Sequence, residues 1–467
     1  MALKYISPKR MTATAMLLMK GIITAFVTGT FLYLVLNYYP ETDFHFKGFL
    51  VFVFLYLCFF GAFVSTYRAF RFGVLKYREI MFGYLLAVFM ANFFMYFVLS
   101  LTAKQLLPLG PITALLIVQW AGGFLLNFWA DRLYYLVHPV RDCIVITSES
   151  REELATLKKF KSIRRRYRIL DEVDETLGLD AILERIRPYS TVILGKVSRQ
   201  LRLELTEHCF EHNQRLFFVP DVTDILMHNS QETFVGDSLL YLCKNRTFTT
   251  EQLIIKRAMD IVISAIGILV TSPIMLITAL LIKAWDGGPV LFKQTRYTRN
   301  LTPFTLVKFR SMVVDAEKDG AQFTVPGDKR ITPIGRFIRA TRIDELPQLF
   351  NIIHGEMSLV GPRAERIENV DFYCELMPEF RYRMKVKAGL TGYAQIYGKY
   401  NTSYEDKLKM DLLYIENCSI LRDLQLLFIT LKVVFMPEST EGYEHEHLSD
   451  IQPGQAGNTE SIKDQSV

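Results

Sequence analysis

Two adjacent carboxylates, Asp344 and Glu345, stand in the segment Thr-Arg-Ile-Asp-Glu-Leu-Pro-Gln-Leu that covers residues 341–349. The pattern predicts a helix start, where the positive end of the helix dipole would keep Asp344 ionised near neutral pH. An ionised carboxylate is a nucleophile, and a pair of carboxylates is a ligand set for a divalent metal. Glu345 then helps to place the metal or the attacking group. A simple N-cap role would explain Asp344 but not its neighbour.

Basic side chains occur in segments that should surround this pair. Residues 287–296 and 304–312 each resemble a strand that ends in polar groups at a cleft, and the second carries Lys308 and Arg310. Arg339 lies just before the carboxylates, and Arg363 follows a Gly-Pro turn at the end of residues 357–363. Lysine supplies a point charge, and arginine supplies a planar fork that binds phosphate through two parallel hydrogen bonds. The residue types therefore suit a ligand that carries phosphate.

These segments resemble the bacterial sugar transferase family, the monotopic phosphoglycosyl transferases, over roughly residues 252–435. The resemblance begins at Lys-Arg-Ala-Met-Asp (256–260), passes through Ser272-Pro273, and includes residues 341–349, 357–363 and 387–395. One departure is that the family's Gly-Pro-Arg-Pro becomes Gly-Pro-Arg followed by Ala364-Glu365. Arg363 is retained, so the phosphate contact should survive.

The resemblance implies transfer of a sugar 1-phosphate from a UDP-sugar to a polyprenyl phosphate, expected to be undecaprenyl phosphate. It implies a ping-pong route in which Asp344 attacks the β-phosphate, with Lys308, Arg339 and Arg363 binding phosphate. Gln395, in the Gly-rich segment 387–395, is a candidate contact near the nucleotide. Mg²⁺ is the expected cofactor, bridging the carboxylates and the diphosphate. By analogy with long family members the sugar is glucose or galactose, with an acetamido sugar as the alternative.

Four apolar stretches near the N-terminus, about 21–39, 49–65, 81–101 and 111–130, each approach the length of ~20 residues that crosses a bilayer. None has an Asp, Glu, Lys or Arg in its interior. Lysines and arginines concentrate before the first stretch and between the second and third, which predicts that both ends of this unit face the cytoplasm. We expect a bacterial plasma-membrane protein with four spans over residues 1–138 and the remainder cytoplasmic.

A fifth apolar stretch, residues 261–282, differs from these because positive charge flanks both of its ends and Thr271-Ser272-Pro273 interrupts it. Proline removes an intrahelical hydrogen bond, and the hydroxyls before it can satisfy freed backbone groups. We expect a re-entrant helix–break–helix that enters and leaves on one face. The alternative, a kinked full span, would put Asp344 on the external face, away from cytosolic UDP-sugars.

Residues 139–248 alternate β-branched runs with helical segments, including strands at 143–147, 190–195 and 215–220 and helices at 152–160 and 198–212. The alternation predicts a parallel sheet with crossover helices. No glycine follows the first strand, so a degenerate Rossmann-like domain without a dinucleotide is expected. The fold class is thus an α/β membrane protein: a four-helix transmembrane bundle, this middle domain, a re-entrant-helix catalytic domain at 249–436, and a polar tail at 437–467 expected to be disordered.

Other function classes are less favoured. A scaffold for polysaccharide assembly needs no complete Asp-Glu and basic set, and a transporter should carry charges inside its spans. The six cysteines show no metal-like spacing, which is typical of reduced thiols. The net charge of +6 is mild, and no nucleic-acid partner is expected. The basic run 158–168 is read as a solvated face, with contact to anionic lipid as the alternative. A homo-oligomer is left open.

Overall fold

The computed structural model describes residues 8–39, 46–148, 166–244, 248–316, 328–398 and 402–434. The chain divides into two compact units, Met1–Val219 and Pro220–Val467, and each is described here by itself. The expected helix at 152–160 and most of the basic run 158–168 fall outside the described residues, as does the tail.

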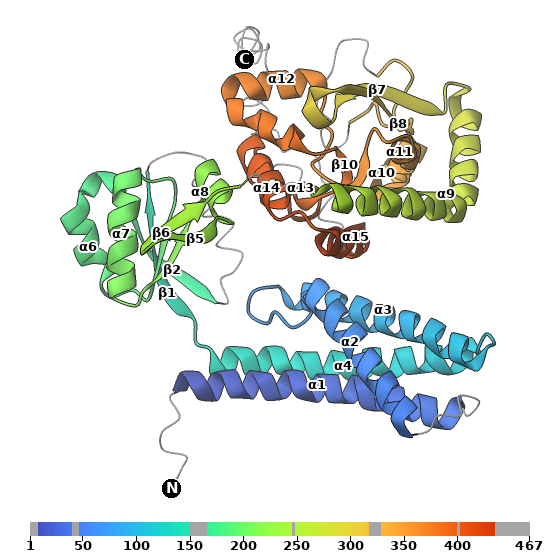
Figure 1. The fold of residues 1–467 in the computed structure, drawn as a ribbon, viewed down its shortest axis with the longest axis horizontal. Coiled ribbons are helices and arrows are strands. Elements are labelled where there is room, and N and C mark those ends of the chain that lie inside the picture. Colours follow the sequence, from blue (N-terminus) through green and yellow to red (C-terminus); the bar gives the residue numbers. More distant parts are fainter. Residues whose placement is uncertain are drawn as a thin grey trace, which may run out of the picture. The chain divides into compact units, whose positions relative to one another are not determined.

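Four long apolar helices open the first unit (Figure 1): α1 (Pro8–Tyr38), α2 (Phe46–Thr66), α3 (Tyr77–Ala103) and α4 (Leu109–Val137). Each is long and apolar enough to cross a membrane. Helix α1 packs on α4, α2 packs on α3, and α3 packs on α4. Large apolar side chains such as Phe54 and Leu101 remain exposed, as expected for a surface that meets lipid.

A buried polar network joins these four helices. The side chain of Gln119 on α4 is fully buried, and its Nε2 donates to the Val27 carbonyl at 2.9 Å and to Thr30 Oγ1 at 3.1 Å on α1. The same nitrogen lies 3.1 Å from the Tyr56 hydroxyl on α2, and Asn92 Nδ2 on α3 donates to Gln119 Oε1 at 2.6 Å. Buried polar groups that are paired in this way fix the relative register of the helices.

The rest of the first unit is a four-stranded parallel sheet of order β2-β1-β3-β4. Its elements are β1 (Arg141–Thr147), β2 (Tyr167–Asp174), β3 (Thr191–Leu194) and β4 (Arg215–Phe218), with η2 (Glu175–Leu177), α6 (Leu179–Ile186) and α7 (Arg199–Glu211). Buried aliphatic residues of β1, β3, α6 and α7 form the core. The three expected strands and the expected helix at 198–212 are confirmed. Strand β2 was not expected, because charged residues interrupt its apolar pattern.

The second unit begins with α8 (Val222–Met227) and a hairpin of β5 (Gln231–Val235) and β6 (Ser238–Leu242). Helix α8 packs on α14 (Tyr404–Glu416), and Ile225 enters the core of this unit. We therefore describe these elements with the second unit, and the domain boundaries expected from the sequence stay predictions.

Helix α9 (Thr250–Asp286) carries the fifth apolar stretch, and Figure 1 shows it bent into two arms. Thr249 and Gln252 form a capping box at its start, and Gly287 ends it with φ 68°. Pro273 cannot donate to the carbonyl four residues earlier, that of Leu269, and Ser272 Oγ donates to that carbonyl at 2.9 Å. The compensation expected of the hydroxyls is confirmed for Ser272, whereas Thr271 Oγ1 donates to the Gly267 carbonyl, which Pro273 does not free. The expected break is instead a bend within a continuous helix.

Most of the remaining elements pack around one core, whereas Ile338 of α10 and Ile343 of η4 join a smaller cluster with Ile282 of α9 and Phe309 of β8. They are β7 (Leu291–Tyr297), η3 (Arg299–Leu301), β8 (Pro303–Phe309), α10 (Pro333–Ala340), η4 (Ile343–Glu345), α11 (Gln348–His354), β9 (Ser358–Val360), α12 (Ile367–Leu376), η5 (Pro378–Lys385), β10 (Gly389–Thr391), α13 (Tyr393–Tyr397), α14 and α15 (Ile420–Val434). Strands β7 and β8 are antiparallel, and β9 and β10 are parallel. Both strands expected at 287–312 are confirmed, whereas the single helical region expected at 411–435 is two helices.

Candidate active site

The carboxylate pair lies in the short 3₁₀ turn η4, and not at the start of an α-helix. Arg342 precedes the turn in the left-handed region with φ 60°, and α11 begins only at Gln348. Hydrogen bonds from Glu345 N to Arg342 O and from Leu346 N to Ile343 O, both 3.2 Å, have the i to i+3 spacing of this turn. Leu346 and Pro347 stay in the right-handed helical region and lead into α11, so Asp344 lies in the first turn of a helical segment as expected, although that turn is 3₁₀ and not α. A backbone reversal at Arg342 positions the carboxylates.

Burial dominates the ionisation of this pair. Asp344 is 8% exposed. Burial and the neighbouring Glu345 charge raise the pKa of Asp344 to about 6, against the attraction of Lys308, Arg339 and Arg342. Burial also acts on Glu345, but Arg363 and Arg342 outweigh it and lower the pKa of Glu345. Asp344 therefore ionises close to neutral pH, and Glu345 at lower pH.

Basic side chains converge on the carboxylates from separate elements. Lys308 comes from β8, Arg339 from the last turn of α10, and Arg363 from the segment after β9. Arg363 Nη2 lies 3.3 Å from Glu345 Oε1. Burial lowers the pKa of Lys308 to about 8, while the charge of Asp344 opposes this shift. The structure thus brings together three of the four basic residues that the sequence singled out.

Arg310, the fourth, has a different partner. It is 7% exposed, and its guanidinium forms an ion pair with Asp286 at the end of α9. Its main-chain N–H donates to the Val290 carbonyl at 2.9 Å. The geometry assigns Arg310 to the junction between α9 and β8.

Arg296 on β7 belongs to the basic cluster, although the sequence reading did not single it out. Its charge acts on Lys308. Its guanidinium donates to Gln294 Oε1 at 2.6 Å and to the Ala364 carbonyl at 3.2 Å. Strand alternation could have revealed it, because Phe292 pairs with Lys308 in the antiparallel register and Arg296 follows Phe292 by four residues on the same face.

The segment that carries Arg363 is held by tight backbone contacts. Gly361 N donates to the Thr391 carbonyl at 2.9 Å, and Gly389 N donates to the Pro362 carbonyl at 2.8 Å. A Cβ on Gly389 would lie 2.1 Å from Gly361 N, so only glycine allows this approach. Gln395 on α13 donates to the Gly389 carbonyl at 3.4 Å. The Gly-rich segment and its Gln395 therefore lie beside Arg363.

An ion-pair network lies beside Ala364 and Glu365, where the sequence differs from the usual Gly-Pro-Arg-Pro pattern. The buried Arg383 donates to the Arg363 carbonyl at 3.1 Å and forms an ion pair with Asp411 at 2.7 Å. Glu365 lies 4.0 Å from the same guanidinium. Burial raises the pKa of Asp411 to about 6, against the attraction of Arg383. The network orients the main chain at Arg363 by side-chain contacts, where the usual family pattern has a rigid proline.

The first arm of α9 contacts the same segment. The buried Lys256 donates to the Val360 carbonyl at 3.2 Å and pairs with Asp423 of α15 at 2.5 Å. Asp260 accepts from Leu359 N at 3.2 Å. Side chains of the apolar helix thus hold the strand that leads to Arg363, which couples the site to α9.

The donor set suits one hard divalent cation that shares its coordination with a ligand. Among the described residues, no group of three or more His, Cys, Asp or Glu side chains forms a metal cage. Mg²⁺ commonly uses one or two carboxylates, several waters and substrate phosphate oxygens. Asp344 and Glu345 fit that requirement, and a cation beside them would offset the repulsion that raises the pKa of Asp344.

Residues 251–437 match the family model described as "Bacterial sugar transferase". A UDP-N-acetylgalactosamine-undecaprenyl-phosphate N-acetylgalactosaminephosphotransferase of Aeromonas hydrophila is 43% identical over 183 residues, 38% of this chain and 43% of that protein. A UDP-glucose:undecaprenyl-phosphate glucose-1-phosphate transferase of Klebsiella pneumoniae is 38% identical over 48% of this chain and 49% of that protein. The chain therefore spans half or less of the length of these two relatives.

A shorter relative is matched along almost all of its length. The exopolysaccharide production protein PSS of Rhizobium leguminosarum bv. phaseoli is 42% identical over 188 residues, 38% of this chain and 94% of that protein. The segment that matches the family model, residues 251–437, contains the carboxylate turn, the basic cluster and α9 from its second residue onward. The chain belongs to the bacterial sugar transferase family.

Proposed function

We propose that this protein transfers a hexose 1-phosphate from a UDP-hexose to undecaprenyl phosphate. The products would be UMP and undecaprenyl-diphospho-hexose, in the first membrane step of capsular or exopolysaccharide synthesis. One observation supports this most directly. A nearly buried carboxylate that ionises near neutral pH lies among Lys308, Arg339 and Arg363. A nucleophile within a phosphate-binding cluster is the arrangement that phosphoryl transfer requires.

The proposed reaction has two displacements. In the first, an Asp344 carboxylate oxygen bonds to the β-phosphorus and the bond from that phosphorus to the bridging oxygen breaks, so UMP leaves with the bridging oxygen. In the second, a phosphate oxygen of the lipid bonds to the same phosphorus, and the Asp344 carboxylate is released. Two steps suit substrates of different solubility, because the sugar phosphate stays on the protein between them.

The basic residues have separate tasks in this scheme. Arg363, which also contacts Glu345, is placed to bind a diphosphate oxygen through its planar fork. Lys308 supplies a positive charge beside Asp344, which stabilises charge that develops on the phosphorus oxygens. A bound Mg²⁺ would supply further charge neutralisation for the diphosphate. Gln395, which lies beside the Gly-rich segment, would contact the nucleotide.

We further propose the membrane arrangement that suits this reaction. Helices α1 to α4 would be transmembrane, the parallel-sheet domain would be a degenerate Rossmann-like domain, and α9 would enter and leave the bacterial plasma membrane on its cytoplasmic face. The bend at Pro273 and the positive flanks of α9 support this. Single cysteines just before Lys256 and just after Lys283, in a cysteine-free background, should be labelled from the same side of sealed vesicles. Labelling from opposite sides would rule out the re-entrant helix.

The sugar is proposed to be glucose or galactose. The names of two relatives described above specify N-acetylgalactosamine and glucose. A Salmonella typhimurium protein, 33% identical over 269 residues, is named for galactose. An acetamido sugar is therefore the alternative donor. UMP release from a panel of UDP-sugars, in membranes supplied with undecaprenyl phosphate, would identify the donor.

The nucleophile is tested without the lipid acceptor. The wild-type protein given labelled UDP-sugar should retain a sugar phosphate on the peptide that contains Asp344, and Asp344→Asn should retain none and release no UMP. Near-normal turnover by this variant would refute the assignment. A wild-type protein that releases no UMP from any donor would instead favour a scaffold in polysaccharide assembly.

A further inference from the structure

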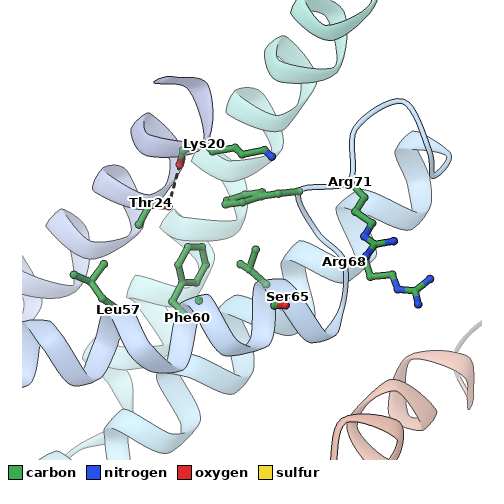
Figure 2. A pocket seen from close by; sticks show the side chains of 10 residues that line it. Lys20, Thr24, Leu57, Phe60, Ser65, Arg68 and Arg71 are labelled. Carbon is green, nitrogen blue, oxygen red and sulfur yellow. Dashed lines mark hydrogen bonds between the residues drawn. The ribbon is translucent and has the colours of Figure 1, made fainter. Parts of the chain in front are cut away.

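A pocket of about 390 Å³ lies within the helical bundle, and none of the candidate active-site residues lines it. Its walls come from the first turns of the apolar part of α1, the last turns of α2, and the loop that follows α2 (Figure 2). This volume is within the range of small-molecule and cofactor sites.

One part of the pocket is apolar. Phe60 of α2 is 1% exposed and forms its inner wall, while Leu57, one turn earlier, is 39% exposed. Phe70 from the loop meets Phe60 edge-on, with ring centroids 6.3 Å apart. Gly61 leaves the mouth open, because a Cβ added there would meet no atom within 4 Å. Such walls suit hydrocarbon.

The other part is basic. Lys20 of α1 and Arg68 and Arg71 of the loop line the pocket. Figure 2 shows the Lys20 side chain extending from α1 toward the loop that carries Arg71. The loop turns back directly after α2, since Ala69 N donates to the Val64 carbonyl at 3.0 Å and Arg68 adopts φ 56°. Figure 2 also shows the Arg68 and Arg71 side chains extending from the loop away from Lys20, so Lys20 is the cation nearest the apolar wall and the two arginines lie at the edge of the pocket.

We infer that this pocket binds a lipid with a phosphate headgroup. The helix ends that carry it lie on the proposed cytoplasmic side, at the depth where lipid headgroups meet acyl chains. A phosphate would contact Lys20, with Arg68 and Arg71 adding positive charge at the edge of the pocket, and the first part of the hydrocarbon chain would lie against Leu57 and Phe60. Basic pockets between membrane helices on the cytoplasmic side bind anionic headgroups in this way. Two lipids supply this chemistry, phosphatidylglycerol and a polyprenyl phosphate. This site is separate from the transferase site.

Native mass spectrometry of the full-length protein titrated with lipid in detergent would measure this binding. Phosphatidylglycerol and undecaprenyl phosphate are the two anionic probes, and phosphatidylcholine is the neutral control. The wild-type protein should retain one anionic lipid. The probe that binds more tightly shows whether the pocket takes phosphatidylglycerol or a polyprenyl phosphate. Retention of neither anionic probe, or equal retention of phosphatidylcholine, would overturn the inference.

Variants that remove charge from the pocket and a variant that fills it test whether the lipid binds there. Lys20→Gln with Arg71→Gln should weaken binding roughly 25-fold, about fivefold for each charge removed near the membrane surface. Arg78→Gln is the matched control, because Arg78 is an exposed cation at the start of α3 on the same proposed side; its affinity should stay within twofold of the wild type. Gly61→Leu keeps all the charges, fills the mouth and should reduce binding at least tenfold. Equal affinity of the double variant and Arg78→Gln, or no effect of Gly61→Leu, would refute the site.

Discussion

Replacing Asp344 with Asn should stabilise the protein at pH 8 while it abolishes activity. The folded state holds this carboxyl with a pKa of about 6, against the ordinary value of 3.8. Between these two values the folded protein binds a proton that the unfolded chain has lost, so the wild type loses stability as pH rises. Asn resembles the protonated carboxyl and does not incur this loss.

The magnitude follows from the shift. About two pKa units at roughly 1.4 kcal/mol each give a gain of about 3 kcal/mol for Asp344→Asn at pH 8. At pH 5 the carboxyl is almost fully ionised in the unfolded chain but still mostly protonated in the folded protein, so only the part of the loss between pH 3.8 and pH 5 has built up and the gain should be about half as large. A gain of this size raises the melting temperature of a domain of 150–250 residues by roughly 6–12 °C.

Thermal unfolding of the full-length protein in detergent, with a chelator to remove divalent cations, measures this gain at both pH values. Glu345→Gln is the matched control, because its neighbours lower the pKa of that carboxyl and favour its charged form. This control should therefore lower the melting temperature at pH 8. A melting temperature of Asp344→Asn at or below that of the wild type at pH 8, or an equal gain at pH 5, would refute the electrostatic reasoning.

Three further predictions concern the site and its supports. The kcat/KM for UMP release should rise with pH near 6 as Asp344 ionises and should fall above about pH 8 as Lys308 loses its proton. Lys308→Arg should remove the fall at alkaline pH, and a kcat/KM that does not change with pH would contradict both assignments. Arg310→Gln should lower the unfolding free energy by removing the ion pair between the buried guanidinium and Asp286, with less than about a threefold change in KM, whereas a large KM effect with normal stability would support the predicted binding role. Pro273→Leu should favour a spanning helix, seen as cysteine labelling of the two ends of α9 from opposite sides.

Much of this site could be predicted because its residues stand in short contiguous motifs. The hydroxyl before Pro273 was expected to satisfy a freed carbonyl, since that geometry is local to one helical turn. Lys308 and Arg363 lie beside the carboxylates as the family resemblance implied. The roles assigned to the site residues and to Mg²⁺ stay predictions.

Long-range partners and backbone reversals could not be predicted in the same way. Arg310 was grouped with the phosphate-binding residues because it follows Lys308 by two positions, but its partner Asp286 belongs to another element. The 3₁₀ form of the turn at Asp344 was not expected, because nothing in the residue type of Arg342 reveals a left-handed conformation. Strand β2 was missed because alternating charges obscured its apolar residues.

The bend of α9 needs no hydrogen-bond donor from outside the helix. Pro273 cannot donate to the Leu269 carbonyl, and the hydroxyl of the adjacent Ser272 donates to it instead. If α9 is re-entrant, as proposed, no neighbouring helix has to supply that donor within the hydrocarbon. The segment from α9 onward would then carry its own means of meeting the bilayer, independent of the four N-terminal helices. The PSS protein is matched along 94% of its length by only 38% of this chain, as expected of a relative that needs no such N-terminal helices for this purpose.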